Sequence, residues 1–329
     1  MKKKLNIDEQ IDYMKNTKNI RFAENEEENA KCFLKNSTYF YKLKSYAKLF
    51  DINKNTGEYW ELYYKQLVEL SKIDLYLRRI LFNMCLSIEH QLKLNLINDI
   101  TNDCDEDGYS IVKIFFKEYP NAYEAFSKKS TKSYCSDIYN KYYDDIPIWA
   151  LVELLSFKEL IDLHEMYYST KATKLGKSYT SKIENFSWSV RIIRNACAHN
   201  NCILNSLKNE NIELNFQLLS EIYKLKLNVN GKPDSNDKKK FQKKLLKHDV
   251  INDILATIIL FNNITTSTKI KENALLDIKN LFEGRMIKEK DLFNIKKSDH
   301  KFIINSVKFV KEIIDLLYTQ QYNTNEDQK

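Results

Sequence analysis

The six residues Arg194-Asn195-Ala196-Cys197-Ala198-His199 bring an arginine, a carboxamide and a histidine together in one short stretch. A histidine can take up and release a proton near neutral pH. An arginine offers a permanent planar cation to a phosphate whose negative charge grows in the transition state. Together they suit RNA cleavage without a metal ion: His199 takes the proton of a 2′-hydroxyl, the oxygen attacks the adjacent phosphate, and Arg194 stabilises the charge. The products would be a 2′,3′-cyclic phosphate and a 5′-hydroxyl, and DNA would lack the nucleophile.

A helix is expected to carry these side chains. Apolar residues recur every three or four positions from Trp188 onward, which predicts a motif helix over about residues 183–201. Asn195 lies one turn from both Arg191 and His199 on such a helix, so these three side chains can form one strip. The apolar face would comprise Trp188, Ile192, Ala196 and His199, widened by Val190, Ile193 and Cys197.

Arg194 and His199 would point in different directions on a straight helix, because five positions at about 100° each place them about 140° apart. Two arrangements could bring both to one phosphate. Either the helix ends near Asn200-Asn201, which are plausible stop residues, or a second copy of the segment faces the first across a two-fold axis.

The string Val190-Arg-Ile-Ile-Arg-Asn-Ala-Cys-Ala-His-Asn200 contains the R-x(4–6)-H signature of HEPN ribonucleases. It resembles in particular the version found in the Abi family of bacterial abortive-infection proteins, the AbiD/AbiF-like group. The resemblance covers roughly residues 20–206, about half of the chain, and fades beyond Asn228. Three further stretches resemble segments of this family: Tyr39–Phe50, the Asp74…Leu77-Arg78…Ile88-Glu89-His90 helix, and Pro147…Trp149…Glu153…Phe157.

The resemblance implies an HEPN-type helical bundle with N-terminal and C-terminal helical additions. It also implies a homodimer that places two motif copies over a common cleft, and a role in antiphage defence by cleaving RNA. Only one R-x-x-x-x-H copy is evident, so a composite site needs a second chain. A structured regulatory RNA or an antitoxin-like protein partner could hold such an enzyme inactive.

The predicted site follows from the motif and the resemblance together. Arg194 and His199 are the expected catalytic residues, with Asn195 orienting them. Glu89 is either a boundary residue on a solvated face or an acceptor that orients Arg191 or Arg194 through a charge-assisted hydrogen bond. The residues expected to bind RNA or to orient others are Arg191, Glu89, His90, Lys93 and Asn200. We expect no cofactor and no metal.

Three functions are compatible with the sequence. The first is a metal-independent endoribonuclease, and the second is an RNA-binding protein of the same fold that does not cut. The third is a protein-interaction module that binds no nucleic acid. The motif itself could also be a structural element in which His199 caps a helix terminus and the arginines face solvent.

Composition favours a helical protein. Five glycines and three prolines in 329 residues argue against a fold rich in β-turns and predict an all-α fold. The formal net charge of +7 permits an anionic partner. However, the chain is rich in lysine, asparagine and isoleucine together, a bias that an AT-rich genome produces without selection for binding.

The cysteines, the N-terminus and the hydropathy indicate a cytoplasmic protein. The six cysteines include no C-x-x-C pair and no zinc spacing, so reduced thiols are expected. Acidic residues rather than an apolar run follow the first lysines, and no stretch is apolar enough to span a membrane. The acidic segment Thr101–Gly108 lacks the EF-hand pattern and is expected to be a solvated loop.

The chain is expected to comprise an Abi-like HEPN domain with an N-terminal helical extension (1–227), an exposed loop (228–240), a C-terminal helical region (241–320) and a disordered tail (321–329). Within the first part, one long helical region runs over about residues 59–99, with a break near Ser71. Its inward stripe is expected to comprise Leu77, Ile80, Leu81, Met84, Ile88, Leu92 and Leu96. In the segment that opens at Pro147, the core candidates are Trp149, Leu154 and Phe157. Residues 39–50 interleave aromatics with lysines, which favours a core-facing helix over an RNA-stacking platform. Residues 127–141 form either an RNA-facing insert or a plain surface segment.

Overall fold

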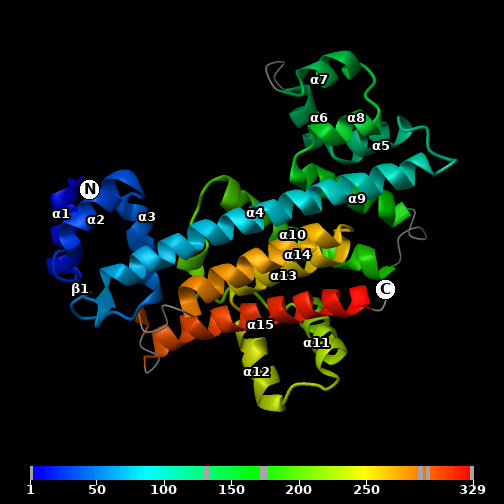
Figure 1. Cartoon of the computed structure of the whole chain (residues 1–329). Coiled ribbons are helices and arrows are strands. Elements are labelled where there is room, and N and C mark those ends of the chain that lie inside the picture. Colours follow the sequence, from blue (N-terminus) through cyan, green and yellow to red (C-terminus); the bar gives the residue numbers. More distant parts are fainter. Residues whose placement is uncertain (1–2, 129–133, 171–176, 288–291, 294–296, 327–329) are drawn as a thin grey trace. The chain divides into compact units, whose positions relative to one another are not determined.

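The computed structural model describes residues 3–128, 134–170, 177–287, 292–293 and 297–326. These residues are mostly helical, which confirms the predicted all-α class (Figure 1). Two short parallel strands, β1 (Ile20–Arg21) and β2 (Leu62–Tyr63), pair with Ile20 opposite Leu62. No helix among the described residues is long and apolar enough to cross a bilayer.

The helices share the labels of Figure 1. In chain order they are α1 (Ile7–Asp12), α2 (Glu26–Asn36), α3 (Phe40–Ser45), α4 (Tyr64–Thr101), α5 (Ser110–Glu118), α6 (Pro120–Ser127), α7 (Ser136–Tyr142), α8 (Ile148–Leu154), α9 (Phe157–Thr170), α10 (Lys177–Ala198), α11 (Phe216–Asn230), α12 (Asn236–Leu245), α13 (Asp249–Ile264), α14 (Thr268–Leu281) and α15 (Ser298–Glu326). Short 3-10 helices cover Tyr46–Leu49 and Leu204–Ser206, and π-helical turns cover Tyr13–Thr17 and Phe282–Ile287.

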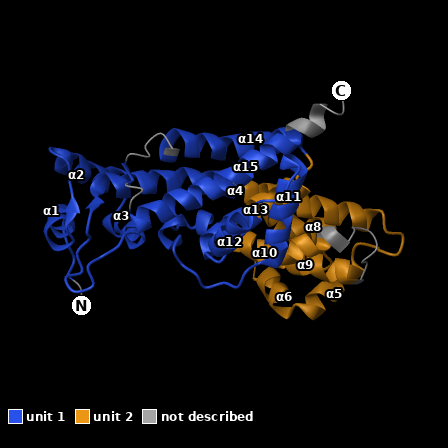
Figure 2. Ribbon diagram, turned by 90° about the horizontal axis from the view of Figure 1, so that it is seen from below, with its two compact units in different colours: residues 1–82, 193–256, 267–329 blue, residues 83–192, 257–266 orange. Residues whose placement is uncertain are grey.

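The chain divides into two compact units (Figure 2). Unit 1 comprises residues 1–82, 193–256 and 267–329, and unit 2 comprises residues 83–192 and 257–266. Helices α4, α10 and α13 contribute residues to both units. Each unit is therefore built from segments that are far apart in the sequence.

Unit 1 buries the first half of α4 together with the helices near the C-terminus. Leu67, Leu77 and Leu81 of α4 are buried, as are Ile251 and Leu255 of α13. Helices α14 and α15 pack side by side (Figure 1). In residues 39–50, where aromatics alternate with lysines, Leu43, Ala47 and Phe50 are buried, which confirms that this segment faces the core.

Unit 2 holds the second half of the α4 stripe. Met84, Ile88, Leu92 and Leu96 are buried, as predicted. Trp149, predicted as a core residue, is half exposed instead, because its ring covers the backbone of Gly108 at the surface. The acidic loop that precedes Gly108 differs from the prediction in one respect: Asp103 is buried, and its carboxylate accepts the backbone N–H of Asp105 at 3.2 Å.

Several element boundaries differ from those expected. Helix α4 has no break at Ser71, whose hydroxyl donates to the carbonyl of Val68 at 2.7 Å within the helix. Helices α11 and α12 extend into the segment 228–240 and leave only residues 231–235 between them. Helix α15 continues to Glu326, because apolar side chains keep recurring up to Leu317 and no helix breaker follows. Helix α10 begins at Lys177, earlier than expected. Part of the segment 127–141 lies outside the described residues.

Candidate functional site

Helix α10 ends at Ala198, one residue before the motif histidine. The backbone N–H of Asn200 donates to the carbonyl of Cys197 at 3.0 Å, and that of Asn201 donates to the carbonyl of Ala196 at 2.8 Å. Asn200 has a φ of 56°, in the left-handed region that asparagine tolerates better than most residues. This pair of bonds is a Schellman turn. The predicted helix end near Asn200-Asn201 is confirmed.

The predicted apolar face of α10 is buried only in part. Val190 and Ile193 of that face are buried, together with Ile183 and Phe186, whereas Trp188 is 64% and Ile192 41% exposed. The prediction was wrong for Trp188 and Ile192 because both sides of α10 carry apolar residues at helical spacing, and the shape of the neighbouring core decides which side is buried. His199 is exposed, like Trp188 and Ile192.

The three predicted catalytic residues lie together in unit 1. Nη1 of Arg194 is 3.4 Å from Oδ1 of Asn195, and the backbone N–H of His199 donates to the carbonyl of Asn195 at 3.0 Å. Arg194 and Asn195 are partly buried. Nε of Arg194 is enclosed and has no hydrogen-bond partner among the described residues. An enclosed cationic donor of this kind gains from an anionic acceptor.

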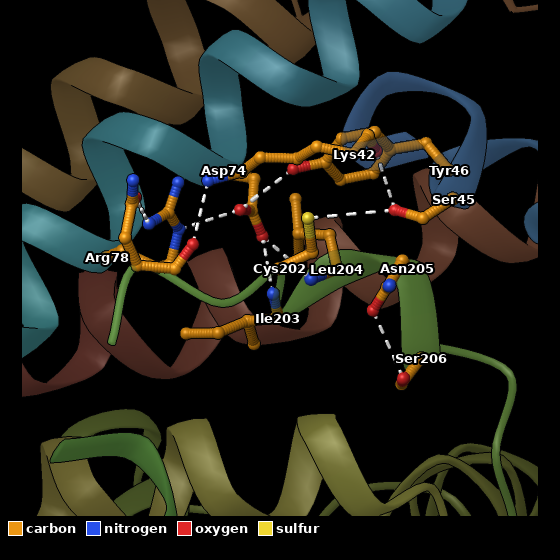
Figure 3. A network of polar contacts seen from close by, with 11 residues as sticks. Lys42, Ser45, Tyr46, Asp74, Arg78, Cys202, Ile203, Leu204, Asn205 and Ser206 are labelled. Atoms are coloured by element: carbon orange, nitrogen blue, oxygen red, sulfur yellow. Dashed lines mark hydrogen bonds and ion pairs between the residues drawn. The ribbon is translucent and has the colours of Figure 1, made fainter. Parts of the chain in front are cut away.

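A buried aspartate holds the chain immediately after the motif (Figure 3). Asp74 of α4 is fully buried, and its Oδ1 accepts the backbone N–H groups of Ile203 at 2.9 Å and Leu204 at 2.8 Å. Its Oδ2 accepts Nε of Arg78 at 2.8 Å and the hydroxyl of Tyr46 at 2.9 Å. Four donors compensate the buried charge, as a carboxylate without water requires.

Two cations then fix Asn200 itself. Arg78 donates through Nη1 to Oδ1 of Asn200, and Nζ of Lys42 donates to the backbone carbonyl of Asn200 at 2.7 Å. Burial, and then the nearby Arg78 charge, lower the pKa of Lys42. The turn that follows His199 is thus held by side chains of two other segments. The predicted RNA contact Asn200 is engaged within the protein.

The thiol within the motif, that of Cys197, is not suited to nucleophilic chemistry. Burial raises the pKa of Cys197 to about 12, and the charge of Asp74 acts in the same direction, so Cys197 remains a thiol at neutral pH. Burial and the Asp74 charge likewise raise the pKa of Tyr46, which stays a hydrogen-bond donor. Among the described residues, no three His, Cys, Asp or Glu side chains gather closely enough to hold a metal ion.

The other predicted residues belong to unit 2. Oε1 of Glu89 is 3.9 Å from Nζ of Lys93, which also lies 3.6 Å from Oε2 of Glu153. Oε2 of Glu89 is buried and has no hydrogen-bond partner within the described part of the chain. His90 is exposed. The guanidinium of Arg191 lies 5.3 Å from the ring centroid of Trp188. The contacts of Glu89 in this unit therefore include Lys93 rather than Arg191.

The residues that position the motif turn were missed as site residues. Lys42, Asp74 and Arg78 form hydrogen bonds with residues 200–204, more than 120 positions away in the sequence, and Tyr46 donates to Asp74. One signal for two of them was present: Asp74 and Arg78 are four residues apart on a predicted helix and belong to a segment that resembles the Abi family. Ion pairs at this spacing are common on helices, so the pattern alone did not indicate the long-range contact.

Comparison with known proteins gives one match. A family model described as "Abi-like protein" matches residues 32–205, just over half of the chain. The matched segment contains Asp74 of α4 and the whole motif from Arg194 to His199. No curated protein and no solved structure matches the chain.

Proposed function

The chain belongs to the Abi-like family of abortive-infection proteins, and we propose on that premise that it is an endoribonuclease that needs no metal ion. The observation that supports this most directly is the setting of His199. The side chain is exposed at the end of α10, and the turn that follows it is anchored by Lys42 and Arg78. A general base has to reach solvent-borne substrate yet stay in place, and this setting meets both needs.

Each motif residue then has a role. His199 takes the proton from a 2′-hydroxyl, whose oxygen attacks the adjacent phosphorus, and the bond from phosphorus to the 5′-oxygen of the next nucleotide breaks. That oxygen takes a proton from water and leaves as a 5′-hydroxyl. Arg194 stabilises the negative charge on the phosphate with its guanidinium. Asn195, beside Arg194 on the same helix, orients that guanidinium. A second copy of the chain would complete the site by supplying another His199 and Arg194 across a two-fold axis.

Cleavage assays in EDTA test this function. A labelled structured RNA and a tRNA pool are incubated with wild type, His199→Ala and Arg194→Ala. Arg79→Ala, which removes an exposed arginine of α4, serves as the matched control. We expect 2′,3′-cyclic phosphate ends from wild type and from Arg79→Ala, and a loss of about 100-fold or more in both motif variants.

Two other outcomes decide against the proposal. Equal cleavage by all four proteins would assign the activity to another site or to a contaminant. Intact RNA that binds tightly and in a salt-dependent manner would favour a non-cleaving protein held in complex with a structured RNA. Circular dichroism of each variant shows that the comparison concerns folded proteins.

A further inference from the structure

The positive charge of the chain is concentrated in one short segment. Residues 224–247 carry nine lysines and two aspartates, a formal net charge of +7 that equals the charge of the whole chain. The segment covers the end of α11, the turn after it and all of α12. It lies outside residues 32–205, which the family model matches.

Helix α12 sorts its lysines onto one side. Lys240, Lys243 and Lys244 of α12 are exposed and follow the three- and four-residue spacing of a single helix face, and Lys247 is exposed in the turn that follows the helix. None of the four forms an ion pair with any described residue. The opposite side of α12 is buried through Gln242 and Leu245. This outward strip of unpaired cations is available to an anionic polymer.

Ion pairs beneath the strip compensate Asp234, one of the two aspartates of the segment. Lys226 is only 2% exposed and binds Asp234 at 2.9 Å and Glu312 of α15 at 2.7 Å. Burial alone would raise the pKa of Asp234, but hydrogen bonds from Lys226, Gln242 and Lys238 hold it at about 2. The carboxylate of Asp234 thus stays ionised, and lysines of the protein compensate its charge. These ion pairs join α11, α12 and α15 (Figure 1).

A pocket with aromatic walls lies beside α12 and is lined by Lys224, Lys226 and Lys239. It has a volume of about 370 Å³, within the range of ligand pockets, and opens between α11 and the start of α12. The ring of Phe216 at its rim is 74% exposed. Nζ of Lys239 lies 5.7 Å from the ring centroid of Tyr223, a second wall. Tyr223 is partly buried, so Phe216 is the exposed ring of this pocket. An exposed aromatic ring beside cations is a surface on which an unpaired base can stack.

We propose that α11 and α12 form a binding surface for single-stranded RNA, separate from the motif. The lysines of the α12 strip bind successive phosphates, and the pocket at Phe216 and Tyr223 takes an unstacked base. A lipid surface fits less well, because Leu245 of α12 is buried and Phe241 is the one large apolar side chain that this helix exposes, too little to insert into a bilayer. The proposal shares with the proposed function the premise that RNA is the ligand, but it does not require cleavage.

Binding of a fluorescent, unstructured 20-nucleotide 2′-O-methyl RNA tests the surface, because a blocked 2′-oxygen cannot attack. The full chain is compared with the triple variant Lys240→Glu/Lys243→Glu/Lys244→Glu over a range of salt concentrations. The matched control is Lys54→Glu/Lys301→Glu/Lys308→Glu, which makes the same charge change at exposed lysines elsewhere in unit 1. Phe216→Ala is compared with Trp60→Ala, which removes another exposed aromatic side chain of unit 1.

We expect the α12 variant to bind at least about tenfold more weakly than wild type. Its salt slope should fall by about 2, because each phosphate that a lysine neutralises contributes about 0.7 to the slope. Phe216→Ala should weaken binding by about fivefold or more, and both controls should bind like wild type.

Equal affinity and slope in the α12 variant would overturn the proposal. So would binding to vesicles containing phosphatidylserine with no binding to RNA. If wild type fails to cut any RNA while the α12 effect holds, only the proposed cleavage is wrong. If it cuts while the α12 variant binds normally, only this inference is wrong.

Discussion

Asn200 meets two requirements at one position, a left-handed backbone and a side-chain acceptor for Arg78. Glycine satisfies the first requirement and alanine neither. Asn200→Gly and Asn200→Ala both remove the hydrogen bond from Arg78. The difference in their free energies of unfolding therefore measures the cost of the left-handed backbone alone. The residue is therefore explained by the turn after His199, whether or not it also contacts RNA.

We expect Asn200→Ala to be less stable than Asn200→Gly by about 1 kcal/mol, the cost of placing a Cβ in the left-handed region. Urea denaturation of the two variants and wild type measures the difference. Equal stabilities would mean that residue 200 does not adopt a positive φ in solution.

Loss of Asp74 should lower stability more than a change at Asn200, because Arg78 is only 5% exposed and its charge would be left uncompensated. Asp74→Asn should lower the free energy of unfolding by about 3 kcal/mol, as for other broken buried ion pairs. Asp105→Asn, in an exposed loop, is the control and should change it by less than about 0.5 kcal/mol. A small effect at Asp74 would show that water reaches Arg78 and replaces the carboxylate.

How much of the site the sequence predicts depends on the distance over which each contact acts. The end of α10 was predictable because Asn200 and Asn201 stop a helix through their own backbone preferences. The bond from Ile203 to Asp74 spans 129 positions, so no local pattern contains it. The functional roles of Arg194, Asn195 and His199 rest on residue chemistry and family resemblance, and they remain predictions.

At the scale of elements, α10 and α8 show the same limit. Trp188 was placed on the apolar face of its helix by its spacing, and Trp149 was a core candidate in a segment that resembles the family; both are at least half exposed. Helical spacing identifies a helix reliably, since it depends on the chain alone. The side that becomes buried depends on what packs against it, and in α10 both sides qualified. The all-α class follows from composition, whereas the division into two units, each built from distant segments, does not.

The ring of Trp149 lies against Gly108 in the turn between α4 and α5. Gly108 has a φ of 78°, and a Cβ there would lie 2.5 Å from Cζ3 of Trp149. Gly231, at the end of α11, has a φ of 68° with no atom within 4 Å of the added Cβ. The two glycines share the backbone requirement and differ in available space.

We expect Gly231→Ala to lower stability by about 1 kcal/mol, from backbone strain alone. Gly108→Ala should lower it by about 2 kcal/mol more, because the Trp149 ring has to move. Urea denaturation compares the two, with Trp149→Leu added to Gly108→Ala to relieve the overlap. Equal losses for both glycines, or no recovery in the double variant, would show that the ring does not lie against Gly108.

At the scale of the whole molecule, buried histidines contribute to the response to acid. Burial lowers the pKa values of His164, His248 and His300, and that of His164 falls to about 3. The unfolded chain protonates a histidine near pH 6.5. Between pH 6.5 and about 3 the unfolded state therefore binds a proton that the folded state excludes at His164, so stability is greatest above pH 6.5 and decreases as the pH falls.

The expected slope is up to about 1.4 kcal/mol per pH unit for each fully excluded proton. His164→Phe should remove one such contribution while keeping an aromatic ring against Tyr168, whose centroid lies 4.4 Å away. Urea denaturation at intervals from pH 7 to pH 4.5 should give a shallower decline for His164→Phe than for wild type. His90→Phe, which replaces an exposed histidine, should keep the wild-type slope. Parallel curves for wild type and His164→Phe would mean that His164 takes up its proton in the folded protein, through local opening of the segment around α9.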